Sequence, residues 1–286
     1  MAVLAPRMAS LRTRVRFRFS NTTLAVAVGV LVLWLVAVAV GPMLIRYDPI
    51  TQVLADRLQP PSGSHLLGTD AFGRDILSRI VNGSRLSLGI AFTTAAISAV
   101  IGTALGLASG FMNKAGAVIT RVNDGVMAFP ATLLAIAMIA VIGRGALTTI
   151  IALTVVFTPQ FVRIAYGESR GLKQKDFVAS ARAAGCRLPR ILLRHVAPYI
   201  AAAVTVQATY VFAMAILSEA GLSFIGAGVP PPAPSWGTMI NEGAIYIGQS
   251  GWMLWPVGVA MTSVVLALNV VGDRLQDVLD PRRSGR

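Results

Sequence analysis

The chain has 286 residues, of which 55% are hydrophobic and 13% charged, with a net charge of +13 and a mean hydropathy of +0.70. A soluble domain carries roughly 25% charged residues, so a chain this apolar is expected to cross a membrane several times. The positive-inside rule explains the excess of Lys and Arg, and no basic patch is interleaved with stacking aromatics, so nucleic-acid binding is not expected. Its one cysteine, Cys186, excludes an intrachain disulfide and a cysteine metal cluster.

The N-terminal segment, residues 1–22, is basic and contains no acidic residue. Residues 23–45 form an apolar run that is long enough to cross a bilayer and about twice the length of a signal-peptide core, although Ala37-Val38-Ala39 resembles a cleavage site. Positive charge beside such a run is typical of the cytoplasmic side. We therefore expect an uncleaved first span and a cytoplasmic N-terminus.

A polar, turn-rich segment, residues 46–85, follows and is expected to lie on the external side of the membrane. Its last part, residues 75–85, is interpreted as a helix lying on the membrane surface. The remaining apolar runs predict five further spans. These are residues 86–111, 125–143, 146–162, 197–218 and 251–271. Six spans in all place both termini in the cytoplasm.

Glycine recurs every four residues in the second predicted span, at Gly102, Gly106 and Gly110. Such a row of small residues lets two helix backbones approach closely, which is the structural interpretation. A substrate pathway along the same row is the functional alternative.

The most basic segment in the second half of the chain is the loop 163–196, which carries eight Lys and Arg residues against two acidic residues. This charge places the loop in the cytoplasm. Within residues 175–198, apolar or small side chains recur at intervals of three and four, which predicts one face of a helix. They are Phe177, Ala181, Ala184, Leu188, Ile191 and His195.

Three residues predict how this basic segment divides into two short helices. Asp176 has the side-chain type that caps helix N-termini. Gly185 is expected to follow the end of the first helix, and Pro189 to open the second. The segment is therefore predicted to form a helix, a turn and a helix, which the flanking spans hold against something outside the membrane.

The sequence lacks the motifs of several chemistries. It contains no Gly-Lys dipeptide and hence no P-loop for ATP, and it has no HExxH motif and no cluster of Cys and His. Its two histidines, His65 and His195, are isolated. The interiors of the six predicted spans contain no ionisable residue, whereas proton- and sodium-coupled carriers usually need such groups at membrane depth. Energy is therefore expected to enter through a soluble partner that contacts the loop 163–196.

The segment between the last two predicted spans, residues 219–250, is expected to be external and is rich in turn-forming residues. Glu219, at the outer end of the fifth span, is either a structural anchor or part of an external gate or substrate contact. The glycine-rich run 221–228 would line the external mouth if it dips into the bundle, because irregular backbone at membrane depth must lie against protein or water.

Four stretches of the chain together resemble one family of transporters. Residues 176–198, DFVASARAAGCRLPRILLRHVAP, look like the EAA coupling motif of binding-protein-dependent ABC importer permeases. Three more are similar to the C-type subunit of the dipeptide, oligopeptide and nickel permeases. They are residues 65–88 (HLLGTDAFGRDILSRIVNGSRLSL), 219–237 (EAGLSFIGAGVPPPAPSWG) and 272–282 (GDRLQDVLDPR). The four matches keep the family order and span most of the chain.

The resemblance implies an all-α membrane protein with the six-helix type I fold of ABC importers. Residues 86–272 are then the permease core, which includes the coupling loop 163–196. Residues 273–286 are a cytoplasmic tail.

The resemblance also implies which residues meet the ATPase. In the family the motif docks into a cleft on the ATPase; here its acidic position is Ala179 and its final Leu-Pro pair is Ala197-Pro198. The shape of the motif and its arginines are then expected to carry docking. The implied coupling residues are Asp176, Ala179, Ser180, Ala181, Arg182, Gly185, Arg190, Arg194 and Pro198. An external gate or a contact with the binding protein is assigned to Glu219, Phe224 and Trp236.

The expected function is that of a permease subunit in the cytoplasmic membrane that imports di- or oligopeptides. Its implied partners are a homologous second permease, ABC ATPase subunits, an extracytoplasmic peptide-binding protein and the lipid bilayer, with no nucleic acid. The chain itself is expected to bind no cofactor or metal and to catalyse no reaction, since the partner ATPases use the ATP. Nickel or another small solute is the alternative cargo. An ion-coupled carrier or channel, or a non-transporting scaffold, is the alternative class.

Overall fold

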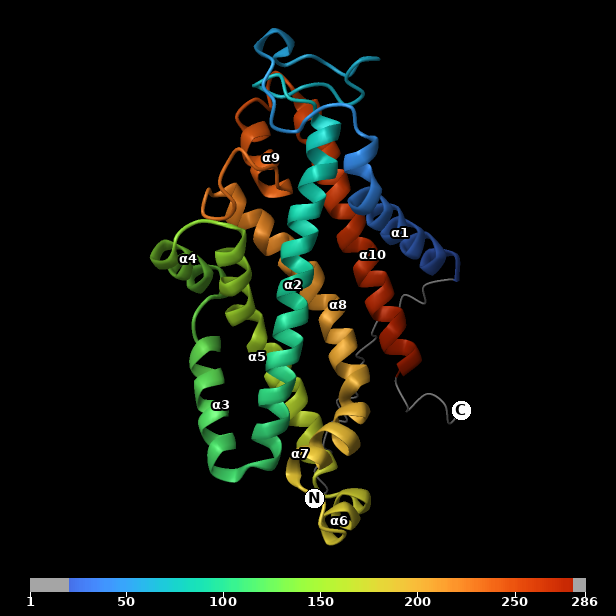
Figure 1. Ribbon diagram of the computed structural model, residues 1–286, viewed down its shortest axis with the longest axis vertical. Coiled ribbons are helices and arrows are strands. Elements are labelled where there is room, and N and C mark those ends of the chain that lie inside the picture. Colours follow the sequence, from blue (N-terminus) through green and yellow to red (C-terminus); the bar gives the residue numbers. More distant parts are fainter. Residues whose placement is uncertain (1–20, 280–286) are drawn as a thin grey trace, which may run out of the picture.

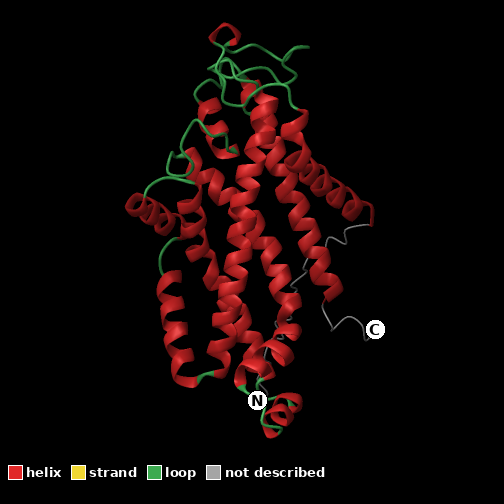
Figure 2. Ribbon diagram, in the orientation of Figure 1, coloured by secondary structure: helices red, strands yellow, loops and turns green. Residues whose placement is uncertain are grey.

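The computed structural model describes residues 21–279, so residues 1–20 of the predicted N-terminal tail and residues 280–286 lie outside the described part. Within that part every regular element is a helix, and the helices form an elongated bundle (Figure 1, Figure 2). The α-helices are α1 (Asn21–Leu44), α2 (Ile76–Phe111), α3 (Asn113–Met127), α4 (Ala131–Ile142), α5 (Ala146–Leu172), α6 (Asp176–Ala183), α7 (Leu188–Arg190), α8 (Ala197–Phe224), α9 (Trp236–Ala244) and α10 (Trp255–Leu279).

Five stretches of the described chain are long and apolar enough to cross a membrane. They are Asn21–Leu44, Ile76–Phe111, Ala146–Leu172, Leu188–Phe224 and Gly251–Leu279. Together α3 and α4 are apolar enough for a sixth span, but the pair is bent by 91°. The predicted number of six spans therefore holds when this bent pair is one broken span.

The predicted span 125–143 is not one continuous helix, because the chain breaks between Met127 and Ala131. Pro130 there has non-helical backbone angles, with φ −57° and ψ 127°. A proline also disfavours the helical conformation in the residue before it, here Phe129. As a result α3 lies beside the bundle and α4 is turned nearly end-on in Figure 1.

The second span begins at Ile76 rather than at residue 86, and the predicted surface helix is wrong. Asp75 is the N-cap of α2, and its carboxylate accepts a hydrogen bond of 2.7 Å from the backbone N–H of Ser78. No break separates residues 76–85 from the apolar part that follows. These residues are therefore the outer turns of a single 36-residue helix.

Two more helices continue past their predicted spans. α5 continues to Leu172, into the loop 163–196, and α10 continues to Leu279, into the tail that was predicted to begin at residue 273. Apolar composition marks only the bilayer-crossing part of a helix, whereas the helix itself continues until its backbone hydrogen bonds end. The polar last turns of both helices thus extend the bundle beyond the apolar zone.

The glycine row of α2 packs directly on α5. A Cβ atom placed on Gly106 would lie 2.6 Å from the Cβ of Ala165 and 2.6 Å from the carbonyl oxygen of Val162. Gly102 and Gly110 approach α5 as closely. This confirms the predicted close helix contact and leaves no space for a substrate between the two helices along the row.

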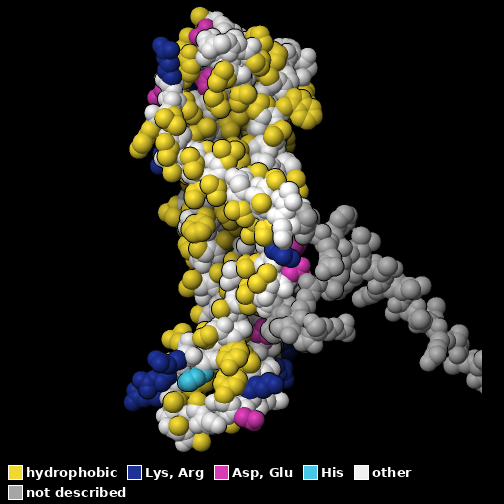
Figure 3. Space-filling view, turned by 90° about the vertical axis from the view of Figure 1, so that its right-hand side faces the viewer, with side chains coloured by type: hydrophobic (Ala, Val, Ile, Leu, Met, Phe, Trp, Pro, Cys, Tyr) yellow, Lys and Arg dark blue, Asp and Glu magenta, His cyan; other side chains and the backbone are white. Residues whose placement is uncertain are grey.

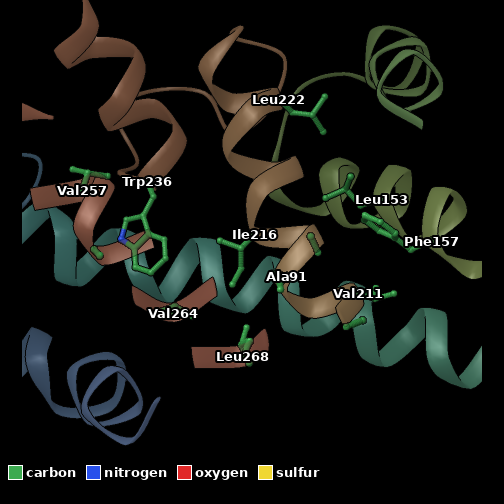
Figure 4. Close-up of a cluster of buried hydrophobic side chains, with 14 of the residues drawn as sticks. Ala91, Leu153, Phe157, Val211, Ile216, Leu222, Trp236, Val257, Val264 and Leu268 are labelled. Carbon is green, nitrogen blue, oxygen red and sulfur yellow. The ribbon is translucent and has the colours of Figure 1, made fainter. Parts of the chain in front are cut away.

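The main hydrophobic core lies where α2, α5, α8 and α10 meet α9 (Figure 4). Trp236, the first residue of α9, has no exposed surface and packs edge-on against Trp34 of α1, with ring centroids 5.2 Å apart. Its backbone N–H donates to Oγ of Ser87 in α2 at 3.1 Å. Figure 4 also labels core residues from the long helices, including Leu153, Phe157, Val211, Ile216, Leu222, Val264 and Leu268.

Hydrophobic and basic side chains occupy different zones of the surface along the long axis of the molecule. Hydrophobic side chains cover much of the middle of the face in Figure 3, as expected for a surface in contact with lipid. Lys and Arg side chains gather at the lower end, which Figure 1 shows to be the end that carries α6 and α7.

Candidate functional site

The first short helix of the basic segment, α6, ends in a turn around Gly185, as predicted. The φ angle of Gly185 is +74°, in the left-handed region. The N–H of Cys186 donates to the carbonyl of Ala181 at 3.0 Å, and the N–H of Gly185 donates to the carbonyl of Arg182 at 2.9 Å. This pair of hydrogen bonds is the Schellman motif, which ends a helix at a residue that adopts positive φ readily.

The two other predicted boundary residues lie one position away from their expected places. Lys175 is the N-cap of α6, so the assignment of Asp176 as the N-cap is wrong; Asp176 is the first helical residue. A carboxylate there still favours the positive end of the helix dipole. Pro189 is the second residue of α7 rather than the first, where its missing N–H also costs no hydrogen bond inside the helix.

Residues 175–198, which we call the coupling hairpin, pack one face against the ends of two long helices. Val178 has no exposed surface. It belongs to a buried cluster that includes Leu107 of α2 and Ala165 of α5. The hairpin is therefore held by side-chain packing as well as by its covalent connections to the bundle.

The hairpin is also coupled directly to α8. The ring of Phe177 stacks on that of Tyr199, with centroids 5.0 Å apart and planes inclined by 18°. A π-helical turn, Ile191–Val196, leads from α7 into α8 without an intervening loop. α6 therefore contacts α8 through a stacked pair of rings, and α7 is joined to α8 by continuous helical backbone.

The predicted inward face of the hairpin is mostly confirmed. Phe177, Ala181, Leu188 and Ile191 pack on the buried cluster or belong to it, whereas Ala184 is exposed and His195 is half-buried. Val178 was missed, although it lies three residues before Ala181 and hence on the same helical face.

The predicted ATPase contacts lie in the hairpin at the lower end of the molecule in Figure 1, and one of them, Arg182, lies over the Phe111 ring at the end of α2. Eight of the nine are exposed; the exception, Ala181, is half-buried against the inner cluster. The exposed residues are Asp176, Ala179, Ser180, Arg182, Gly185, Arg190, Arg194 and Pro198. They are accessible to a partner, and their contact with an ATPase stays a prediction.

Four charged side chains form a buried network at the opposite end of the bundle. Oδ2 of Asp70 accepts hydrogen bonds from Nε of Arg74 and Nη1 of Arg79, both at 2.6 Å. Glu242 of α9 accepts from Nη2 of Arg74 at 2.7 Å, and its Oε2 lies 2.9 Å from Nη2 of Arg79. Burial raises the pKa of the Glu242 carboxyl, and the charge of Arg74 opposes that rise. The network joins the segment between α1 and α2 to α2 and α9.

A second polar pair fixes the start of α2. Nδ1 of His65 lies 3.0 Å from Oδ1 of Asp75, the residue that caps this helix. Both residues are buried. His65, isolated in the sequence, is thus part of the folded segment between α1 and α2. All members of the network and of this pair except Glu242 lie within the stretch 65–88, whose mixture of acidic and basic residues was the available sequence signal.

We expect Asp70→Asn to destabilise the protein strongly, because Arg74 and Arg79 would lose the carboxylate that they share. Removing one partner from a buried ion pair costs about 3–5 kcal/mol. The free energy of unfolding in detergent, measured by chemical denaturation, should fall by an amount in that range. Asp124→Asn makes the same change at an exposed position of α3 and should have little effect. Equal stability of the two variants would contradict a structural role for the network.

The three residues assigned to an external gate do not lie together on the surface. Glu219 has no exposed surface and lies inside α8, which continues past the predicted end of the span to Phe224. Ser223 donates to Oε1 of Glu219 at 2.8 Å, and the Ser223 oxygen accepts from the N–H of Val229 at 3.2 Å. These contacts favour the structural anchor over the gate for Glu219.

Trp236 is not placed to contact a binding protein, because its side chain is in the core. The assignment failed because an indole near a proline-rich loop has the same sequence signature whether it packs inward or outward. Phe224, at the end of α8, is 42% exposed and is the only accessible member of the three. Its role in a gate stays a prediction.

Comparison with known proteins shows the class of this bundle. Residues 98–285 match the family described as the inner membrane component of binding-protein-dependent transport systems. Together with the apolar spans, this defines a multi-pass protein of the cytoplasmic membrane. The chain belongs to this family of ABC importer permeases.

Peptide transport permeases of other bacteria are similar to this chain over most of its length. The di/tripeptide transport system permease protein of Pseudomonas aeruginosa is 41% identical, over 84% of this chain and 82% of that protein. The dipeptide transport system permease protein of Alkalihalophilus pseudofirmus is 39% identical, over 80% of this chain and 75% of that protein. A chain of the MetNI methionine ABC transporter, solved in an inward-facing conformation, has a TM-score of 0.58 at 20% identity and covers 70% of this chain and 95% of that chain. This last likeness shows the fold alone.

Proposed function

We propose that this chain is a permease subunit of an ABC importer that moves di- or oligopeptides across the cytoplasmic membrane, with both termini inside. The proposed mechanism of coupling rests on one observation: the coupling hairpin has an exposed outer face and an apolar inner face packed on the bundle. Relatives named for dipeptide, di/tripeptide and glutathione transport support a peptide cargo. Nickel or another small solute is the alternative cargo within the same class.

Family membership implies that the chain works with ATPase subunits and a second permease. We infer in addition that an extracytoplasmic binding protein delivers the substrate to the end of the bundle that carries α9. The exposed arginines of the hairpin, Arg190 and Arg194, are available to acidic groups of an ATPase. Together with the shape of the hairpin and with Arg182, they would carry docking in the absence of an acid at Ala179.

The proposed mechanism is transmission of motion by packed helices. Closure of the ATPases on ATP moves α6, and the buried contact of Val178 carries the displacement to α2 and α5. The stacked pair Phe177 and Tyr199 carries it to α8. Packed helices have discrete stable arrangements, so a small displacement at one end biases the whole bundle between two states. The chain then catalyses no bond chemistry of its own.

We expect the purified chain alone to hydrolyse no ATP, because its sequence contains no P-loop. Reconstituted in liposomes with its ATPases, the second permease and the binding protein, it should support ATP-dependent uptake of a labelled dipeptide. Competition with unlabelled dipeptides, longer peptides and nickel identifies the cargo. ATP hydrolysis by the isolated chain would contradict the subunit assignment. Competition by nickel alone would show that nickel, and not a peptide, is the cargo.

A further inference from the structure

A cleft of ≈ 650 Å³ lies between α5, α8 and α10. Its lining reaches from Glu168, in the last turns of α5, and Tyr199, near the start of α8, to Leu279, the last residue of α10. These are the parts of the three helices that lie toward the coupling hairpin. The proposed transport mechanism gives the cleft itself no role.

The polar part of the lining favours a cationic ligand. It includes two carboxylates, those of Glu168 and Asp273, and no Lys, Arg or His among the described residues. Throughout residues 21–279, no Lys or Arg forms an ion pair with either carboxylate. Two tyrosines of α8, Tyr199 and Tyr210, are 65% and 49% exposed and also line the cleft. Carboxylates pair with guanidinium groups, and aromatic rings stack on them.

The remaining lining is largely apolar. Small and branched side chains from all three helices contribute, namely Ile164, Ala202, Ala203, Val206 and Leu268. The cleft extends along α8 from Tyr199 to Tyr210, which is about 16 Å of helix. A chain that carries both arginine and apolar side chains therefore fits this surface better than a small ion does.

The described chain begins beside this cleft. Asn21 is the first residue of α1, and its Oδ1 accepts a hydrogen bond of 3.5 Å from Nη2 of Arg274 in α10. Arg274 directly follows Asp273, one of the two carboxylates of the lining. The residues that precede Asn21 are thus joined to the bundle next to the acidic part of the cleft.

Residues 7–19, which we call the arginine segment, have the matching composition. The segment contains five arginines and no acidic residue, and from residue 14 to residue 19 arginines alternate with apolar residues. The arginines are Arg7, Arg12, Arg14, Arg16 and Arg18, and the alternating apolar residues are Val15, Phe17 and Phe19. Arg18 and Arg12 precede Asn21 by three and nine positions, so a fully extended chain places them at most about 11 and 32 Å from it. The segment is long enough to cover the cleft.

We propose that the arginine segment docks in this cleft, with arginines on Glu168 and Asp273 and apolar side chains on the apolar lining. Charge complementarity and the place where the chain joins the bundle select this occupant. The docked segment lies against Tyr199, whose ring stacks on Phe177 of the coupling hairpin. It therefore adds an intramolecular contact next to the one that links the hairpin to α8. The inference does not depend on the cargo.

The test is disulfide formation in the assembled transporter, in a chain whose Cys186 is replaced by Ser. Thr13→Cys together with Ala202→Cys places one thiol in the arginine segment and one in the lining of the cleft. Copper-catalysed oxidation should join the two thiols within one chain, which mass spectrometry of tryptic peptides identifies. Thr13→Cys with Ala201→Cys is the matched control, because Ala201 is the neighbouring, exposed residue of α8 and does not line the cleft. Its disulfide should form more slowly.

Charge reversal separates docking from chance encounters of the thiols. Glu168→Lys with Asp273→Lys makes the cleft cationic, so the initial rate of disulfide formation with Ala202→Cys should fall about fivefold. Adding Arg12→Glu and Arg14→Glu in that background should restore the rate. Asp124→Lys reverses an exposed charge of α3 outside the cleft and should leave the rate unchanged.

Equal rates for the two thiol pairs would overturn the proposal, as would a rate that the reversal in the cleft does not change. If the second reversal fails to restore the rate, the first acted by disturbing the helices and the proposed pairing is wrong. A disulfide that joins two copies of the chain would show that the cleft receives another subunit instead. Dipeptide uptake by the same preparations tests the transport function independently.

Discussion

Gly106→Val is expected to prevent normal assembly of the bundle. A side chain at this position meets the backbone of α5, since even a Cβ atom would lie 2.6 Å from the carbonyl oxygen of Val162. Backbone cannot move aside as a flexible side chain can, so α2 and α5 must separate along their contact. Overpacking costs about 1–3 kcal/mol, and more where backbone is displaced. The thermal unfolding midpoint in detergent and the yield of the assembled transporter should both fall.

Gly89→Val is the matched control, since it makes the same substitution in the same helix. Gly89 is exposed, and no atom lies within 4 Å of a Cβ placed there. The two variants change helix propensity and hydrophobicity equally, so any difference between them reports the contact with α5. If Gly106→Val were as stable as Gly89→Val, the close packing of α2 on α5 would be wrong.

Gly185→Val is expected to abolish substrate uptake while leaving the membrane bundle folded. The φ angle of +74° is poorly accessible to a β-branched residue, and the left-handed conformation costs about 1–2 kcal/mol for ordinary residues. No atom lies within 4 Å of a Cβ placed at this position, so the penalty comes from the backbone and not from a clash. The turn that ends α6 should therefore open and move the hairpin out of position for the ATPase. Copurification of the ATPases and dipeptide uptake are the measurements.

Gly185→Asn tests whether uptake requires the left-handed backbone conformation at this position or the glycine residue itself. Asn adopts the left-handed conformation more readily than other residues with a side chain and also ends helices in this way. It should retain most of the uptake and the association with the ATPases. Normal assembly and uptake in Gly185→Val would show that the turn is not needed for docking.

Local patterns were sufficient to predict much of this protein. Apolar runs predicted the long spans, because crossing a bilayer needs about 20 apolar residues wherever the helix lies in the fold. The glycine row predicted the contact of α2, and Gly185 predicted the end of α6, since both depend on the backbone freedom of a single residue type. The segment 175–198 was predicted as a helix, a turn and a helix for the same reason.

Other features depend on residues that the sequence keeps far apart. Arg74 and Glu242 are 168 positions apart and are joined by a hydrogen bond of 2.7 Å. No local sequence pattern around either residue indicates the other as its partner, so the buried network was missed. The same limit explains Trp236, whose burial depends on α1 and α2 packing around it.

Composition, periodicity and glycine positions act locally, so they were enough to predict that this protein crosses the membrane and carries a basic helical hairpin. The start of α2 at Ile76, the 91° bend between α3 and α4, and the network of four charged side chains at the end opposite the hairpin became visible only in the folded chain. Helix ends, bends and buried charge pairs depend on which distant segments supply packing and hydrogen-bond partners.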